Sequence, residues 1–348
     1  MKLGKTDIEL SHLGLGCMSI SEFYGEPIAE EDGIELIKTA YHEGVNFFDT
    51  ADAYAFGRNE KLVGKAIAEL ANEGIPREKI VIATKCGIIR DEHDITKRGV
   101  SNKYDYVKAC CEASLERLGP SVAYIDLYYL HRVAEGGAQL DEAMRAMAEL
   151  LDVGKIRGVG LSEATIEMIE IANAALSKYT NGKHQIAALQ TEYSLMTRVA
   201  ETSGVLDFCR KHDITFVAYS PLSRALLTGE VIDPAQQFAE NDFRRSLPRF
   251  QADNLKKNQL IVNKVSAMAK NKGCTTAQLA LAWLLNQSGV VPIPGTTKIK
   301  NLKANVASQS VHFTQEELDA LNDLEPAEGY RYTESAMKTY GFHDELDG

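Results

Sequence analysis

Residues 30–49 read EEDGIELIKTAYHEGVNFFD, and this stretch decides the fold class. Residues 30–44 carry apolar side chains at spacings of three and four and end at Gly44, which is typical of an amphipathic helix with a glycine after its last turn. The run VNFFD at residues 45–49 is short and apolar, as a buried strand is. A helical pattern followed at once by a buried strand predicts βαβ units and a parallel sheet.

The same alternation extends over the chain. Further helical patterns cover residues 101–119, 140–155 and 257–273, and further strands are expected at residues 13–16, 80–84, 125–130, 156–162, 188–191, 215–220 and 290–294. Eight strands, each followed by a helix, close most naturally as a (β/α)8 TIM barrel. The rival is an open doubly wound sheet, which usually has a glycine-rich turn after its first strand, and the candidate turn GLGCMS lacks the third glycine. The sequence therefore predicts an α/β fold of the TIM-barrel type.

No linker or internal repeat divides the chain, so we expect a single domain over residues 1–348. The opening MKLGKTDIELS is expected to form a β-hairpin that caps the bottom of the barrel. Three stretches are longer than a connection needs, namely residues 88–102, residues 222–250 and the tail after Pro326. Long loops in a compact barrel are usually functional or mobile, so we expect these at the C-terminal face as lids.

Composition excludes several classes of function. The net charge of −11 argues against a protein that binds nucleic acid or an anionic membrane surface. No secretory signal and no apolar run of membrane-spanning length is present. The six cysteines, Cys17, Cys86, Cys110, Cys111, Cys209 and Cys274, lack the spacing of a zinc site. Cys110 and Cys111 lie in a helical stretch and are expected to be reduced, packed thiols. The sequence thus predicts a cytoplasmic protein with no metal.

Candidate catalytic residues lie where strands end. Asp49 and Tyr54 follow the second strand, Lys85 the third and His131 the fourth, and active sites of such barrels lie at these ends. A neighbouring ammonium stabilises a phenolate, so Lys85 is expected to lower the pKa of Tyr54, with Asp49 holding Lys85. His131 is expected to hydrogen-bond a substrate carbonyl. Taken singly, a helix cap, rim packing, a solvated charge and a structural histidine explain these residues as well, but their coincidence favours an acid–base site.

The other half of the rim offers a different chemistry. Ser162 has a hydroxyl and Gln190 an amide that can hydrogen-bond a carboxamide. Tyr219 has a ring that can stack on a flat heterocycle. Residues 295–298, GTTK, enter a helix and can bind a phosphate through backbone N–H groups, hydroxyls and a cation. An ordinary barrel turn is the alternative at this position.

These motifs resemble the aldo-keto reductase superfamily. FFDTADAYAFGRNEKLVGKAI resembles the signature that holds the catalytic Asp and Tyr, and ATKCG, DLYYLHR, GVGLSE, LQTEYSL, VAYSPLSRALLTG and VVPIPGTTKIKNLKANV resemble later blocks. The resemblance runs from about Lys2 to Leu324. Within the superfamily, RFQADNLKKNQLIV and CEASLERLG are most similar to the branch of plant perakine reductase and auxin-induced-protein-like reductases.

The resemblance implies reduction of aldehydes or ketones to alcohols by NADP(H) bound across the barrel top. It implies a catalytic tetrad of Asp49, Tyr54, Lys85 and His131, with Tyr54 as the general acid. The implied cofactor-binding residues are Ser162, Gln190 and Tyr219 at the nicotinamide, Ser220, Pro221, Leu222, Ser223 and Gly229 at the pyrophosphate, Gly295, Thr296, Thr297 and Lys298 at the 2′-phosphate, and Asn305 near the adenine.

Three positions depart from this pattern at the cofactor end. Glu163 stands where many members have Asn, Asn301 where many have Arg, and Ala304 where a Glu contacts the base. Lys298 is then the main cation for a 2′-phosphate, and NADPH remains expected over NADH.

Two other functions compete with the reductase. Potassium-channel β-subunits resemble the same superfamily, so a regulatory subunit of a membrane channel is one alternative. A Schiff-base aldolase using Lys85 is the other, against which Asp49 counts because such a lysine has no fixed carboxylate partner. The expected partner is a small-molecule carbonyl, with aromatic aldehydes suggested by Tyr24 and Phe56, and the chain is expected as a monomer or homo-oligomer.

Overall fold

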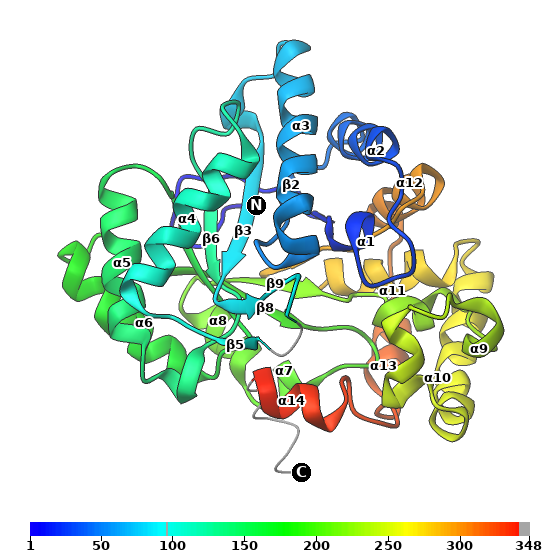
Figure 1. Ribbon diagram of the computed structural model, residues 1–348. Coiled ribbons are helices and arrows are strands. Elements are labelled where there is room, and N and C mark those ends of the chain that lie inside the picture. Colours follow the sequence, from blue (N-terminus) through cyan, green and yellow to red (C-terminus); the bar gives the residue numbers. More distant parts are fainter. Residues whose placement is uncertain (95–96, 341–348) are drawn as a thin grey trace.

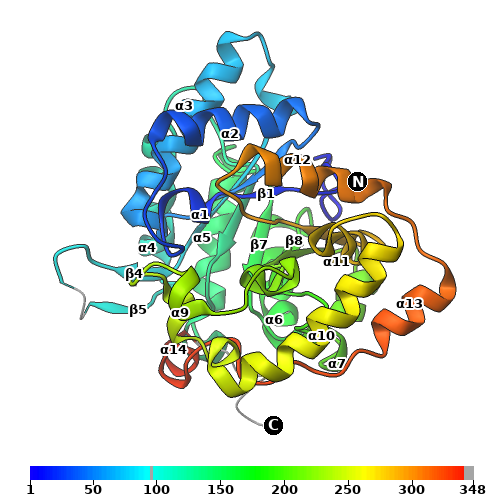
Figure 2. The same cartoon turned by 90° about the vertical axis from the view of Figure 1, so that its right-hand side faces the viewer.

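The computed structural model describes residues 1–94 and 97–340 and contains an eight-stranded parallel sheet wrapped by helices (Figures 1 and 2). In sheet order the strands are β1 (Leu15–Gly16), β2 (Phe47–Asp49), β3 (Val81–Cys86), β6 (Leu127–Leu130), β7 (Val159–Ser162), β8 (Ile186–Glu192), β9 (Thr215–Tyr219) and β10 (Val290–Pro292). All eight predicted strands are confirmed, with ends that differ by up to three residues. The fold is the predicted (β/α)8 barrel.

The first and last strands meet and close the barrel. Gly16 forms a parallel bridge with Gly295, and its N–H donates to the carbonyl of Pro294 at 3.3 Å. A Cβ atom at Gly16 would lie 2.8 Å from the Ile293 carbonyl oxygen. Only glycine therefore allows the two strands to approach this closely.

The helices alternate with the strands along the chain. They are α1 (Met18–Ser21), α2 (Glu30–His42), α3 (Arg58–Asn72), α4 (Tyr104–Leu118), α5 (Leu140–Asp152), α6 (Ile166–Thr180), α7 (Val199–Thr202), α8 (Val205–Lys211), α9 (Pro234–Gln237), α10 (Ala252–Asn271), α11 (Thr276–Leu285), α12 (Ile299–Ala307), α13 (Gln315–Asn322) and α14 (Glu334–Tyr340). The four predicted helices are α2, α4, α5 and α10. Helix α10 begins five residues earlier than its apolar pattern indicated. None of the helices in the described part of the chain is long and apolar enough to cross a membrane.

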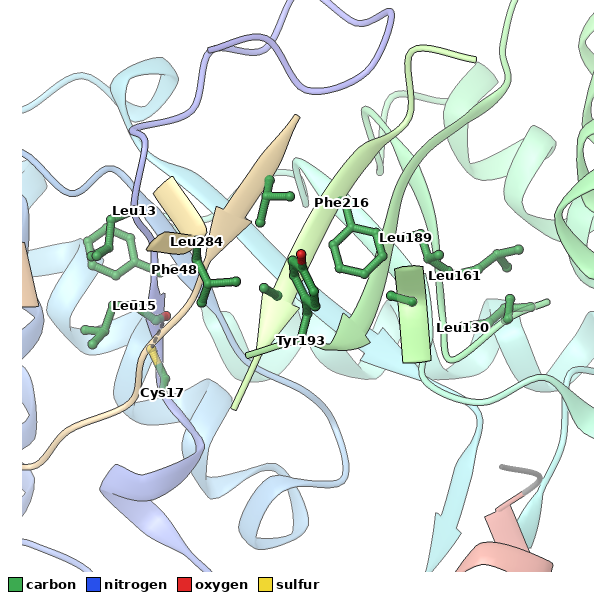
Figure 3. Close-up of a cluster of buried hydrophobic side chains, with 14 of the residues drawn as sticks. Leu13, Leu15, Cys17, Phe48, Leu130, Leu161, Leu189, Tyr193, Phe216 and Leu284 are labelled. Carbon is green, nitrogen blue, oxygen red and sulfur yellow. Dashed lines mark hydrogen bonds between the residues drawn. The ribbon is translucent and has the colours of Figure 1, made fainter. Parts of the chain in front are cut away.

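Two apolar layers follow from the period of two along each strand. Phe47 faces the barrel interior together with Val81 and Leu127, whereas Phe48, the next residue, packs outward among the helices. Figure 3 shows this outer layer, in which Phe48 and Phe216 lie beside leucines from neighbouring strands. Strands buried on both faces explain why the strand sequences read as continuous apolar runs.

The N-terminal hairpin cap is confirmed. Lys2 and Glu9 form an antiparallel bridge, and the Leu3 N–H donates to the Ile8 carbonyl at 2.9 Å. Leu3 and Ile8 are buried with the interior layer of the barrel. The hairpin bonds to Thr215, the first residue of β9, so it lies at the amino ends of the strands, opposite the expected site.

The three long segments are more ordered than plain loops. Residues 88–102 contain β4 (Ile88–Arg90) and β5 (Arg98–Val100), which pair as an antiparallel hairpin, although residues 95–96 lie outside the described chain. Residues 222–250 form α9 and three 3₁₀ turns, η4 (Ser223–Thr228), η5 (Phe243–Ser246) and η6 (Pro248–Phe250). The tail forms α14, which contacts β5, as Figure 1 shows, and residues 341–348 lie outside the described chain.

Candidate active site

Four predicted catalytic side chains lie together at the carboxyl ends of β2, β3 and β6. Lys85 Nζ donates to Asp49 Oδ1 at 2.5 Å and to the Thr50 carbonyl at 2.7 Å, and it lies 3.5 Å from the Tyr54 hydroxyl. The ring of His131 meets that of Tyr54 edge to face, with centroids 5.6 Å apart. The predicted pairing of Asp49 with Lys85 is present. Asp49 and Lys85 are fully buried, whereas Tyr54 is partly accessible.

Burial favours the neutral forms of both Asp49 and Lys85. It raises the pKa of Asp49 and lowers the pKa of Lys85, and the attraction between the two groups opposes both shifts. Gln190 Nε2 donates to the second carboxylate oxygen, Asp49 Oδ2, at 2.7 Å. The aspartate is therefore held from two sides, and it fixes the ammonium in turn.

The pKa of Tyr54 differs from the sequence expectation. Lys85 was expected to lower it, but burial and the negative charge of Asp49 raise the pKa of Tyr54 well above its ordinary value. The physical reason is burial, which disfavours the charged phenolate, and the negative charge of Asp49 adds to it. Tyr54 therefore carries its proton throughout the neutral range, which suits a proton donor.

His131 is neutral in this environment. Burial, followed by the positive charges of Lys85, Arg132 and Arg90, lowers the pKa of His131 well below its ordinary value. Its Nδ1 is buried and has no hydrogen-bond partner. A neutral imidazole with an open ring nitrogen can bind a polar group without adding charge to the site.

The residues expected at a nicotinamide lie on the next three strands. Ser162 ends β7, Gln190 lies in β8 and Tyr219 ends β9. Ser162 Oγ accepts from Arg132 Nη1 at 3.2 Å, and the Tyr219 hydroxyl lies 3.2 Å from the Tyr332 hydroxyl. Gln190 reaches Asp49, so this half of the rim is joined directly to the predicted tetrad.

The segment after β9 has an unusual backbone. Ser220, Ser223, Arg224 and Ala225 all have positive φ values, between 48° and 81°. Such residues cost conformational energy and persist where their surroundings hold them. The Ser223 hydroxyl is buried and has no partner. This segment includes the other residues expected at a pyrophosphate, namely Pro221, Leu222 and Gly229.

The expected phosphate turn does enter a helix. Residues 295–298 connect β10 to α12, and Lys298 is the N-cap residue of α12 with an exposed side chain. The Lys298 N–H donates to Thr296 Oγ1 at 3.1 Å. Asn305 is buried on the same helix, two turns later. Thr297 is partly exposed, so the turn presents a hydroxyl and an ammonium to solvent.

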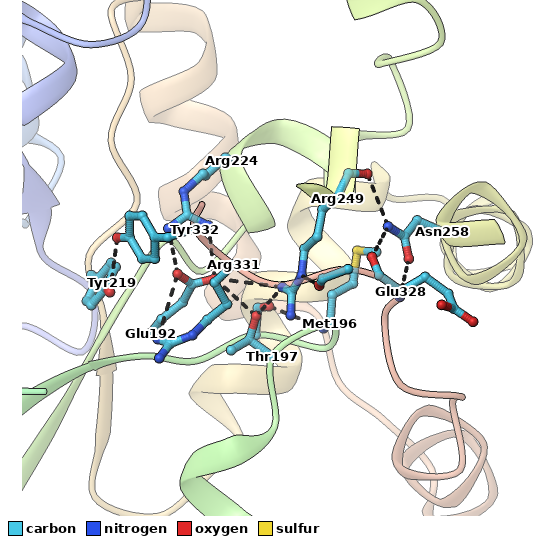
Figure 4. A network of polar contacts seen from close by, with 12 residues as sticks. Glu192, Met196, Thr197, Tyr219, Arg224, Arg249, Asn258, Glu328, Arg331 and Tyr332 are labelled. Carbon is cyan, nitrogen blue, oxygen red and sulfur yellow. Dashed lines mark hydrogen bonds and ion pairs between the residues drawn. The ribbon is translucent and has the colours of Figure 1, made fainter. Parts of the chain in front are cut away.

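A buried charge network on this half was not predicted. Glu192 accepts from Arg224 Nη1 and Nη2 at 3.1 and 2.6 Å, and Glu163 accepts from Arg331 Nη1 and Nη2 at 3.1 and 3.2 Å (Figure 4 shows the Glu192 side). Arg249 lies 3.8 Å from Glu192. Glu163 is thus engaged with the C-terminal segment, which accounts for a glutamate where asparagine was expected. Two buried charges among apolar strand residues, Glu163 and Glu192, were the signal available in the sequence.

Tyr24 packs against an aromatic ring and an arginine. The Tyr24 ring meets Phe243 at 5.3 Å, and the Arg244 guanidinium lies 4.7 Å from the Tyr24 ring. Burial raises the pKa of Tyr24 to about 12. Tyr24 and Phe56 were expected near a substrate. Phe56 lies two residues after Tyr54, and its ring lies 4.5 Å from the Arg90 guanidinium. Within the described residues no group of three or more potential ligands could hold a metal ion.

Known proteins resemble this chain in sequence and in fold. A relative from Glycine max, "Probable aldo-keto reductase 1", is 42% identical over 327 residues, which are 94% of this chain and 88% of the relative. The solved glycerol dehydrogenase of Gluconobacter oxydans superposes with a TM-score of 0.80 at 28% identity, covering 93% of this chain and 94% of that one. A thermostable aldo-keto reductase bound to the inhibitor epalrestat superposes with a TM-score of 0.70 at 30% identity, covering 93% and 99%.

Residues 12–326 match the Aldo/keto reductase family itself, which spans the barrel from before β1 to beyond α13. Sequence, fold and strand-end chemistry therefore agree. The chain belongs to the aldo/keto reductase family, whose members are oxidoreductases that reduce carbonyl compounds with a nicotinamide cofactor.

Proposed function

We propose that this chain reduces aldehydes or ketones to alcohols with NADPH and that Tyr54 donates the proton. The observation that carries the proposal is the position of one ammonium. Lys85 Nζ lies 2.5 Å from Asp49 and 3.5 Å from the Tyr54 hydroxyl, at the end of the barrel where such enzymes work.

The cofactor, when bound, supplies the hydride that the carbonyl carbon receives. The oxygen then gains negative charge and takes the proton of Tyr54, whose raised pKa keeps that proton in place at neutral pH. Lys85 stabilises the charge that develops on the tyrosine oxygen, and Asp49 keeps the ammonium at that distance. The neutral His131 donates a hydrogen bond to the carbonyl oxygen and orients it.

The chain's own residues fit a dinucleotide phosphate. The buried Ser223 hydroxyl lacks a partner, and the positive φ values of Ser220 and of the consecutive residues Ser223, Arg224 and Ala225 turn their backbone groups in unusual directions. Lys298 and Thr297 at the start of α12 supply a cation and a hydroxyl for a 2′-phosphate. We therefore propose NADPH as the preferred cofactor, with Ser162, Gln190 and Tyr219 at its nicotinamide.

The Schiff-base alternative is disfavoured by the same geometry. A lysine that attacks a carbonyl must release its proton and be free to move. Lys85 instead donates to the Asp49 carboxylate and to the Thr50 carbonyl from a fully buried position.

Several broader properties belong to the same proposal. The 42% identical plant relative supports placement in the branch of perakine reductase and auxin-induced-protein-like reductases. Six free cysteines support a reducing compartment such as the cytosol. Arg331, in the C-terminal tail, donates to Glu163 at the barrel rim, and this contact supports one domain over residues 1–348.

The test is a carbonyl panel, with benzaldehyde and glyceraldehyde among its members, followed by the oxidation of NADPH. We expect turnover, with aromatic aldehydes among the better substrates because Tyr24 and Phe56 are the aromatic residues proposed beside the substrate. Tyr54→Phe should lower kcat by at least about two orders of magnitude and leave NADPH affinity near the wild-type value. Turnover close to wild type in Tyr54→Phe would remove Tyr54 from the mechanism, and no NADPH oxidation with any carbonyl would overturn the reductase function.

A further inference from the structure

The two residues after Tyr54 adopt a backbone conformation that side chains disfavour. Ala55 has φ 46° and Phe56 has φ 55°. Both values lie in the left-handed region, which favours glycine, and neither residue is a glycine. Such conformations persist only where surrounding contacts hold them, and they concentrate at functional sites. The turn that carries the proposed proton donor is therefore held by something outside itself.

A single ion pair holds it. The Ala55 N–H donates to Glu22 Oε2 at 2.7 Å, and the Ala53 carbonyl accepts from Arg90 Nη1 at 2.7 Å. Glu22 and Arg90 bond to each other through Nη1–Oε2 at 3.0 Å and Nη2–Oε1 at 2.5 Å. The backbone groups on both sides of Tyr54 are thus bound by one carboxylate and one guanidinium.

The two residues of the pair come from two different connecting segments of the chain. Glu22 follows α1, and Arg90 lies in β4 of the β4–β5 hairpin. The Arg90 guanidinium lies 4.5 Å from the Phe56 ring and 5.3 Å from the Phe23 ring. Only 19% of each side chain of the pair is exposed, so both are held firmly in place. A bidentate pair with stacked rings fixes orientation as well as distance.

We propose that Glu22 and Arg90 are positioning residues that hold Tyr54 at the distance from Lys85 needed for proton transfer. This inference rests on the proposed role of Tyr54. The distance between Lys85 Nζ and the Tyr54 hydroxyl is 3.5 Å, at the outer limit of a hydrogen bond, so a small rotation of the turn removes the contact. Neither residue touches the reacting atoms, and their effect passes through the peptide groups beside Tyr54.

The variants Glu22→Ala, Glu22→Gln and Arg90→Lys test this role. Glu22→Ala removes the acceptor for the Ala55 N–H and should lower kcat between about tenfold and hundredfold, with NADPH affinity within about twofold of wild type. Glu22→Gln keeps an acceptor oxygen and should recover most of that loss. Arg90→Lys keeps the charge but loses the planar fork, so its kcat should lie between wild type and Glu22→Ala.

The exchanged double variant Glu22→Arg with Arg90→Glu separates positioning from stability. It restores an ion pair, but it places a donor against the Ala55 N–H and an acceptor against the Ala53 carbonyl. The melting temperature should return toward wild type while kcat stays low. The matched controls are the two single variants Glu201→Ala and Glu201→Gln, because Glu201 forms a bidentate pair with Arg198 at 2.5 Å, away from the tetrad. Both control variants should have the kcat of wild type.

Two outcomes overturn the inference. One is recovery of both melting temperature and kcat in the exchanged variant, which would make the pair a structural tie alone. The other is a Glu22→Ala enzyme with wild-type kcat beside an inactive Tyr54→Phe, which leaves the proposed function intact. An active Tyr54→Phe enzyme would instead remove Tyr54 from the mechanism, and with it the role on which this inference rests.

Discussion

Buried charges lie on both halves of the barrel rim, and their neutralisation differs between the halves. At β2 and β3 the Asp49 carboxylate and the Lys85 ammonium face each other. Burial dominates there, so the pKa of Asp49 is raised and the pKa of Lys85 is lowered, and both shifts favour the neutral forms. At β7 and β8 two carboxylates, Glu163 and Glu192, face three guanidiniums. Arginine keeps its charge in proteins, so the guanidiniums of this network stay ionised.

Both halves have open hydrogen-bonding atoms, but their carboxylates are bound differently. His131 Nδ1 is buried without a partner beside the tetrad, and the Ser223 hydroxyl is buried without a partner on the other half. Buried polar atoms without partners are costly and are retained where a ligand completes them. The Glu192 and Glu163 carboxylates, by contrast, are bound by arginines on both oxygens. The side of the rim with Asp49 and Lys85, at β2 and β3, is called the reactive half below. The side with Glu163 and Glu192, at β7 and β8, is called the rigid half.

The largest expected effect concerns Lys85. Lys85→Met should lower kcat by at least about three orders of magnitude, because the charge that stabilises the Tyr54 oxygen is gone. The barrel should stay folded and bind NADPH, since Asp49 already has a raised pKa and takes up a proton when its partner is lost. Single-turnover NADPH oxidation and circular dichroism measure the two properties.

Two further variants sharpen that result. Lys85→Arg keeps a charge but misplaces it, so only slight activity is expected. Asp49→Asn should be milder than Lys85→Met, since it loosens the ammonium without removing it. Trapping of a carbonyl on Lys85 by borohydride, with no NADPH consumption, would overturn the reductase mechanism.

On the rigid half the corresponding change acts on stability. Glu192→Gln should lower the free energy of unfolding by about 3 kcal/mol, because Arg224 and Arg249 cannot lose their protons when the carboxylate is removed. Chemical denaturation measures the loss. Glu201→Gln, in a more exposed pair, is the matched control and should cost less than about 1 kcal/mol. Equal losses in the two variants would contradict the network as a stabilising unit.

The Asp49–Lys85 pair was readable in the sequence and the charge network of Glu163 and Glu192 was not, for a physical reason. Parallel strands bring their carboxyl ends to one rim, so Asp49 and Lys85 could be placed together from strand positions alone. The Glu163–Arg331 contact joins residues 168 apart, and the tail that carries Arg331 shows no periodic pattern. The predicted lowering of the Tyr54 pKa is wrong because burial, which depends on the packed fold, outweighs the nearby charge.

Cofactor choice gives a smaller effect at the edge of the rigid half. Lys298→Ala should weaken NADPH binding by roughly 1–3 kcal/mol and leave NADH binding almost unchanged, because only the 2′-phosphate meets the ammonium. Lys300→Ala is the matched control, since Lys300 is exposed on the same helix two residues later. Fluorescence titration with both cofactors measures the difference. An equal loss for NADPH and NADH would place Lys298 at another part of the cofactor.

The smallest expected effect is on the pH dependence of stability, where the two halves should have opposite signs. Burial raises the pKa of Glu163, but Arg331 and Arg132 outweigh it, so the pKa is lowered from its ordinary value of 4.5. The unfolded chain therefore takes up this proton first as the pH falls. The stabilisation is complete above about pH 4.5, the unfolded value, and is lost as the pH falls toward the folded value.

Asp49 has a raised pKa, so its folded form binds the proton more tightly and gains stability as the pH falls. Urea unfolding at pH 7, 5 and 3 separates the two groups. Glu163→Gln should flatten the acid decline of wild type, since it removes a group that loses stabilisation there. Asp49→Asn should steepen the decline, since it removes a group that gains. Shifts of the same sign in both variants would contradict the division of the rim into a half that accepts protons and a half that stays ionised.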